Sequence, residues 1–292
     1  MIRRPFFVLL LITLFATGCS TTEEAIQPDI PAETLYLTGM EALKDGRHKT
    51  ASKNFEEVDR KHPFSPWATK AQINLIYSHY KEQEFPEVIS SAERFIRLHP
   101  RHPHVSYAYY MRGLAHYQQI STALKDQLQT REAMVAFQEV ISRFPQSDYA
   151  WEAERMLNLC RFRLAEQEIV VARYYLDRAE YIAAMNRFAK IIENPQYNDT
   201  PFVEEALFSL SLASIKLGLQ EEAKNYAAVL GHNFPQGPYY QWTYGMLEGN
   251  RLISKSELQN LRREVASGSL FTQFFEGLKP GMPSGMTTPD KP

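Results

Sequence analysis

The sequence predicts an all-α fold, a tetratricopeptide-repeat solenoid of about five helix-turn-helix units with a C-terminal capping helix. From Ala32 to about Arg263 the chain is rich in helix-forming residues, and its glycines and prolines fall mainly at regular breaks. A proline recurs every 37 to 50 residues at one place in a repeated pattern, and repeats of this length are typical of helical solenoids. These prolines are Pro63, Pro100, Pro145, Pro195 and Pro235.

Each unit is predicted to be a helix, a tight turn, a second helix and a proline stop. A small or β-branched residue stands twelve positions before the proline, or eleven in the fourth unit, and lets the two helices approach closely. A second marked position follows four residues later on the same helix face. Proline ends the second helix because it lacks an N–H and clashes with the preceding turn. The two positions are Ala51 and Phe55, Val88 and Ala92, Ala133 and Phe137, Ala184 and Phe188, and Ala223 and Ala227.

The first element is a lipoprotein signal peptide over residues 1–18. A basic start is followed by an apolar run of about ten residues, Phe6 to Phe15, which is too short to cross a bilayer. Small residues then lead directly into Cys19, which we expect to carry the lipid, and Ser20 favours the outer membrane. Residues 19–31 read as the lipidated N-terminus and a flexible spacer.

The solenoid is predicted to fill residues 32–265, with repeats 1–3 in 32–145 and repeats 4–5 plus the capping helix in 146–265. We expect long connections at 118–130 and 194–200, a stretch at 151–179 long enough for two helices, and further helix over 239–276. Residues 266–292 hold an aromatic cluster and then a tail rich in glycine and proline, which we expect to be disordered. The aromatic cluster is either core or an exposed docking patch.

Composition and motifs argue against several classes of function. The formal net charge is −2, and loss of Arg3 and Arg4 with the signal makes it −4, so a nucleic-acid partner is not expected. Cys160 would then be the remaining cysteine, and its helical spacing predicts a buried residue rather than a reactive thiol. The histidines of 99–104 suit a proline-shaped turn between repeats better than a metal site. We expect no catalytic residue, no metal and no cofactor apart from the covalent lipid.

Two blocks of sequence resemble the BamD (ComL) family of outer-membrane assembly lipoproteins. Arg94-Phe95-Ile96 through Pro100, His102 and Pro103 leads into Tyr107, Tyr110, Gly113 and Leu114, which matches the family's R-F-I-x-x-x-P-x-H-P and Y-x-x-Y-x-x-G-L signature. The second block comprises Arg163-Leu164-Ala165, Val171-Ala172-x-Tyr174-Tyr175 and Ala184-x-Asn186-Arg187-Phe188. The resemblance extends from the lipobox to about Pro195.

The resemblance implies a non-enzymatic subunit of the complex that inserts β-barrel proteins into the outer membrane, anchored by lipid and facing the periplasm. Its implied partners are the barrel assembly subunit with its periplasmic domains, other assembly lipoproteins and unfolded outer-membrane proteins. The C-terminal half would contact the assembly subunit, with Arg187, Asn186 and Phe188 as candidates. The N-terminal half would receive substrate, with Tyr77, Tyr80, Arg94, Arg97 and Tyr110 as candidates.

Two other readings share some of these features. A pilotin for a secretin, or a lipoprotein that coordinates peptidoglycan factors, would have the lipobox and repeats without the R-F-I-x-x-x-P-x-H-P block. A cell-wall hydrolase on a helical solenoid would need a nucleophile or a carboxylate in a cleft, and Glu132, Glu139 and Glu166 read as solvated helix positions.

Overall fold

Five antiparallel helical hairpins form the body of the protein. The computed structural model describes residues 29–267 except 121, 123, 124 and 250, and in that part of the chain we find twelve α-helices and a short 3₁₀ helix but no strand. The predicted all-α repeat fold is thus confirmed. The hairpins are α2 (Ala32–Lys44) with α3 (His48–Lys61), α4 (Pro66–Lys81) with α5 (Phe85–Leu98), α6 (Val105–Gln118) with α7 (Leu128–Arg143), α8 (Asp148–Asp177) with α9 (Tyr181–Glu193), and α10 (Phe202–Leu217) with α11 (Gln220–Asn233).

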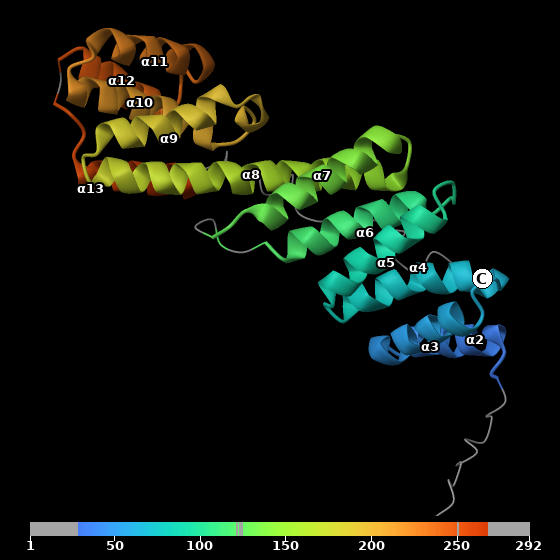
Figure 1. Cartoon of the computed structure of the whole chain (residues 1–292). Coiled ribbons are helices and arrows are strands. Elements are labelled where there is room, and N and C mark those ends of the chain that lie inside the picture. Colours follow the sequence, from blue (N-terminus) through green and yellow to red (C-terminus); the bar gives the residue numbers. More distant parts are fainter. Residues whose placement is uncertain (1–28, 121, 123–124, 250, 268–292) are drawn as a thin grey trace, which may run out of the picture.

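The hairpins stack in chain order into an elongated, curved solenoid, with α2 at one end and α11 at the other (Figure 1). Each first helix also contacts the first helix of the next hairpin, from α2 and α4 through to α10 and α12, and second helices have no comparable contact with each other in the described residues. Elements that approach each other most closely lie on the inside of a curved stack. The first helices α4, α6, α8 and α10 therefore line the concave face.

The repeated positions predicted from the proline spacing are all buried, at 0 to 6% exposure, which confirms the pattern. The first helices also contribute small residues where the second helices approach. A Cβ atom added at Gly113 of α6 would lie 2.7 Å from Cε1 of Phe137 on α7, and one added at Gly39 would lie 2.6 Å from Phe55 on α3. Glycine is thus needed at these points because an aromatic ring fills the space that a side chain would take.

Helix α8 corrects the prediction of two helices over 151–179. It is one continuous helix of 30 residues, and its sequence contains neither glycine nor proline to end it. Residues up to Cys160 pack into the core of hairpins 2 and 3, whereas residues from Phe162 onward pack into the core of hairpins 4 and 5. The helix therefore joins the two halves of the solenoid. Cys160 is buried, as predicted.

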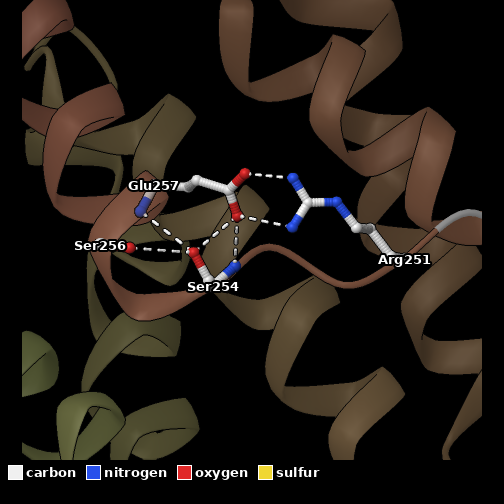
Figure 2. Close-up of polar contacts among 4 residues, drawn as sticks. All are labelled: Arg251, Ser254, Ser256 and Glu257. Atoms are coloured by element: carbon white, nitrogen blue, oxygen red, sulfur yellow. Dashed lines mark hydrogen bonds and ion pairs between the residues drawn. The ribbon is translucent and has the colours of Figure 1, made fainter.

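The predicted helix over 239–276 is also wrong as one element. Helices α12 (Pro238–Leu247) and α13 (Lys255–Ser267) are separated by a break in which Gly249 has a φ of 87°. Helix α13 begins with a capping box (Figure 2). Ser254 Oγ accepts a hydrogen bond from the backbone N–H of Glu257, and Glu257 Oε2 accepts one from the backbone N–H of Ser254. Arg251 also donates to the Glu257 carboxylate. Cys19, the spacer up to residue 28, and the aromatic cluster and tail beyond residue 267 lie outside the described residues.

The two predicted long connections are present. Residues 119–127 separate α6 from α7, and a 3₁₀ turn at Pro195–Tyr197 precedes α10. The histidine-rich segment forms the predicted turn between hairpins, with the ring of His102 5.4 Å from that of Phe95 and 6.2 Å from that of His99. Within the described residues, no helix is long and apolar enough to span a membrane.

Candidate functional site

Tyr77 and Tyr80, two of the predicted substrate residues, lie half-buried on α4. Lys81 Nζ lies 5.4 Å from the ring centre of Tyr77, and the Tyr80 hydroxyl accepts a hydrogen bond of 3.2 Å from Gln118 of α6. The ring of Tyr80 lies 6.1 Å from that of Phe85 on α5, and the ring of Tyr77 lies 6.3 Å from that of His48 on α3. Tyr77 and Tyr80 therefore offer partly exposed rings on α4 beside neighbouring aromatic side chains.

Tyr110, on α6, is buried rather than on the surface. Its side chain is 3% exposed, and its ring centre is 5.9 Å from that of Phe137 and 5.4 Å from that of Tyr149. Burial, followed by the nearby carboxylate of Glu152, raises the pKa of Tyr110 and keeps its phenol neutral. Tyr110 thus packs between α7 and the start of α8 and offers almost no surface to a ligand.

Arg94 and Arg97 belong to α5, a second helix, and the structure does not place them beside the tyrosines. Arg94 is paired with the buried carboxylate of Asp59 in the preceding hairpin. That carboxylate also accepts from Gln72 Nε2 at 2.6 Å. Arg97 is largely exposed and lies 3.9 Å from Glu93 one turn earlier. Arg94 thus joins two repeats, whereas Arg97 is available to solvent.

A buried ion pair at the start of α8 was not anticipated from the sequence. Arg155 Nη1 donates to both carboxylate oxygens of Glu152, at 3.0 and 2.9 Å, and the guanidinium lies 5.0 Å from the ring centre of Trp151. Trp151 itself is 63% exposed. The i,i+3 spacing of glutamate and arginine beside a tryptophan is the signal that could have indicated it. The arrangement fixes a large exposed aromatic surface at the N-terminal end of α8, on the side of hairpins 2 and 3.

The predicted contact for the assembly subunit lies on α9. Arg187 Nη1 donates to Glu168 Oε2 of α8 at 3.0 Å, and Lys190 Nζ lies 3.6 Å from the other oxygen of that carboxylate. Asn186 is exposed, while Phe188 is fully buried. The structure thus brings Asn186 and Arg187 to the surface and uses Phe188 to pack α9 against the core.

An exposed isoleucine on the same helix was also missed. Ile182 is 67% exposed and stands one turn before Asn186, which stands one turn before Lys190. Arg187 and Lys190 face the single carboxylate of Glu168 and exposed Glu193 follows one turn after Lys190, so this α9 face combines apolar surface with closely spaced charges of both signs. Placing the sequence on a helix would have found it, because Ala184, Phe188 and Ile191 occupy the opposite, buried face.

A cavity of about 590 Å³ opens between the ends of α9, α10 and α11. Its walls combine apolar side chains, including Val203 and Tyr226, with the carboxamides of Asn198, Asn225 and Asn233. Carboxamides both donate and accept hydrogen bonds, so they suit an extended backbone. Asn225 and Asn233 lie on α11 and Asn198 lies in the segment before α10, so their convergence could not be read from the sequence.

Two kinds of reactive group bear on chemistry in the described residues, namely metal-ligating side chains and the thiol of Cys160. No group of three or more potential metal-ligating side chains occurs there. Burial raises the pKa of Cys160 to about 12, so the thiol stays protonated at neutral pH. The surfaces described above are suited to binding.

Most of the chain is similar to one family of known proteins. Residues 28–230 match the model of the family described as "YfiO: Outer membrane lipoprotein". A protein of Caulobacter vibrioides named outer membrane protein assembly factor BamD is 35% identical over 254 residues, which cover 85% of this chain and 83% of that protein. The protein of that name from Neisseria meningitidis serogroup A is 37% identical over 242 residues, which cover 79% and 90%. A solved tetratricopeptide-repeat protein of Thermus thermophilus aligns with 75% of this chain at 14% identity and a TM-score of 0.35.

Proposed function

Because the chain belongs to the YfiO family of outer membrane lipoproteins, we propose that it is a lipid-anchored, non-enzymatic subunit of the machinery that assembles β-barrel proteins in the outer membrane. The observation that carries this proposal is the match to proteins named as assembly factors over most of both chains. The barrel assembly subunit, other assembly lipoproteins and unfolded outer-membrane proteins are its proposed partners. The protein would work at the periplasmic face of the membrane.

The architecture suits a tethered adaptor. The lipid on Cys19 would hold the chain near the membrane, and the described residues begin at the α2 end of the solenoid (Figure 1). Hairpins 4 and 5 lie at the opposite end, where they can reach the periplasmic domains of a partner. An unfolded barrel strand exposes unpaired backbone groups and apolar side chains, and it aggregates unless it is held close to its insertion site.

We assign the contact with the assembly subunit to the exposed face of α9. Arg187 and Lys190 place two positive charges around the single carboxylate of Glu168, and Ile182 adds apolar surface beside them. Acidic side chains facing Arg187 and Lys190, with an apolar neighbour on the partner, would complement this face. Phe188 would act by positioning α9 from the core.

Substrate contact is assigned to the partly exposed tyrosines of α4. Tyr77 and Tyr80 offer partly exposed rings with a hydrogen-bonding tip, which suits extended chains with alternating apolar residues. Arg97 lies on a different helix and would act as a peripheral charge for a terminal carboxylate. Tyr110 would act from the core by packing α6 against α7 and the start of α8.

The test is a pull-down of the tagged, lipidated protein from its own envelope, with mass spectrometry of the co-purifying proteins. We expect a large barrel protein with periplasmic domains, and we expect Arg187→Glu to reduce its recovery several-fold. Arg60→Glu is the matched control, since Arg60 is an exposed arginine beside a glutamate on the second helix of hairpin 1. Recovery of a secretin or of peptidoglycan enzymes, without a barrel assembly protein, would overturn the proposal.

A further inference from the structure

Helix α13 folds back onto the concave face of hairpins 4 and 5. Arg262 of α13 donates from Nε to Glu205 Oε1 of α10 at 2.7 Å, and its Nη1 lies 3.6 Å from Asp177 Oδ1 of α8. Lys255 Nζ, at the start of α13, donates to the backbone carbonyl of Asp177 at 3.3 Å. In Figure 1, α13 is drawn behind the C-terminal part of α8, and both contacts with α8 are made at Asp177. The helix thus occupies the groove that the first helices α8 and α10 form.

The groove carries a specific chemistry for its occupant. Two carboxylates, Glu205 and Asp177, face the guanidinium of Arg262, and Glu205 is oriented from behind by Arg173, whose Nε donates to Oε1 at 2.8 Å. Leu258 and Leu261, four residues and one residue before Arg262, are buried. The groove therefore recognises an amphipathic helix with the pattern Leu-x-x-Leu-Arg.

This docking is less tight than the packing of the hairpins. The backbone of α13 stays farther from α8 and α10 than paired hairpin helices do from each other, so long side chains make the contact. A cavity of about 190 Å³ lies between α13 and the ends of α8 and α10, and one of about 510 Å³ lies between α13 and α12. Arg262 Nη2 is buried without a hydrogen-bond partner. Buried polar groups normally have a hydrogen-bond partner, so the contact of α13 with the solenoid is incompletely satisfied.

The N-terminus of helix α13 is capped by residues of its own segment. Its capping box and the ion pair of Arg251 with Glu257 satisfy its N-terminus locally, without help from the solenoid (Figure 2). A seven-residue break, 248–254, connects it to α12. The match to the family ends at residue 230, which leaves α13 outside the matched region.

We propose that the concave face of α8 and α10 is a binding groove for a partner's amphipathic, arginine-bearing helix, and that α13 occupies this groove in cis until such a helix displaces it. Glu205 and Asp177 give the site its charge complementarity. Occupation in cis lowers the apparent affinity for a partner helix by the fraction of molecules in which the groove is open. The groove is distinct from the exposed α9 face proposed above for the assembly subunit.

The test uses the full chain and a fluorescent synthetic peptide of residues 251–267. In the Arg262→Glu variant the new carboxylate would face Glu205 and Asp177, which should release α13. We expect the peptide to bind this variant at least tenfold more tightly than the wild type. Arg263→Glu, the same change at the exposed neighbouring arginine, should leave the weak binding of the wild type unchanged. A peptide that itself carries Arg262→Glu should not bind.

A second measurement avoids any variant that could fail to fold. Excess unlabelled peptide is added to the wild-type protein, and hydrogen exchange of the α13 amides of the chain is followed by mass spectrometry. We expect protection of α13 to fall while that of α10 stays constant. Unchanged protection at saturating peptide, together with equal peptide binding by the wild type and Arg262→Glu, would overturn the proposal.

Discussion

Two adjacent glutamates on α10 should respond in opposite ways to the same isosteric substitution. Glu205 is 3% exposed and accepts hydrogen bonds from Arg173 and Arg262, which come from two other helices. Glu204 is 4% exposed, and its Oε1 is buried without a hydrogen-bond partner. We predict that Glu205→Gln destabilises the C-terminal half and that Glu204→Gln does not.

The magnitude follows from what each change leaves behind. Glu205→Gln leaves two guanidinium groups facing an uncharged amide, and removing one partner of a buried ionic group costs about 3–5 kcal/mol. We take the lower end, about 3 kcal/mol, because the side chain of Arg173 remains 31% exposed. Burial raises the pKa of Glu204, so its charge is already unfavourable, and the loss of that charge should change stability by less than about 1 kcal/mol.

The assay must report on the C-terminal half, because solenoids unfold in parts. Urea unfolding by circular dichroism gives the global change, and hydrogen exchange of α10 and α13 gives the local one. Equal unfolding free energies of the two variants would refute the role assigned to the ionic cluster of Glu205, Arg173 and Arg262. A loss of unfolding free energy below about 1 kcal/mol in Glu205→Gln would refute it as well.

Other expected outcomes concern pH, packing, capping and reactivity. Burial alone would raise the pKa of the Glu205 carboxyl, but Arg173 and Arg262 outweigh burial and lower this pKa. The stabilisation by ionised Glu205 is therefore complete above the unfolded-state pKa of about 4.3, and it is lost as the pH falls through the folded-state pKa. Protection of α13 from exchange should accordingly decrease in acid in the wild type and change little in Glu205→Gln. Gly113→Val should cost about 1–3 kcal/mol in thermal or urea unfolding because its Cβ meets the buried ring of Phe137, and a smaller cost in the background of Phe137→Leu would identify that contact; equal costs would refute it. Ser254→Ala should weaken α13 by about 1 kcal/mol, seen as faster exchange at its first turn, and no change would show that the capping box contributes little. Cys160 should resist iodoacetamide at pH 8 until the protein is unfolded, since burial raises the pKa of its thiol to about 12, and rapid labelling of the native protein would contradict that burial.

The repeat architecture could be predicted because it depends on short-range sterics. Positions such as Ala133 and Phe137 are specified by their distance from a proline stop, and both are fully buried. The length of the stretch 151–179 predicts two helices, but the stretch contains no helix-breaking residue, and α8 is therefore a single helix. The break before α13 was missed although Gly249 marks it with a left-handed backbone.

The candidate site was less predictable, because exposure depends on how the repeats stack. Tyr110 and Phe188 belong to motifs that resemble the family, yet neighbouring helices cover both side chains. Exposed residues such as Trp151 and Ile182 carry no motif, and they are exposed because no neighbouring helix covers them. The contact of Arg262 with Glu205 joins residues 57 positions apart, beyond the reach of any local pattern.

Conditional depletion of the chain from its own bacterium tests the central claim most directly, with folded outer-membrane barrels measured by their heat-modifiable migration in gels. The account predicts that folded barrel proteins decline soon after depletion while unrelated outer-membrane lipoproteins persist, and that the wild-type chain restores them. Normal levels of folded barrels after complete depletion would contradict the proposed role in outer-membrane protein assembly.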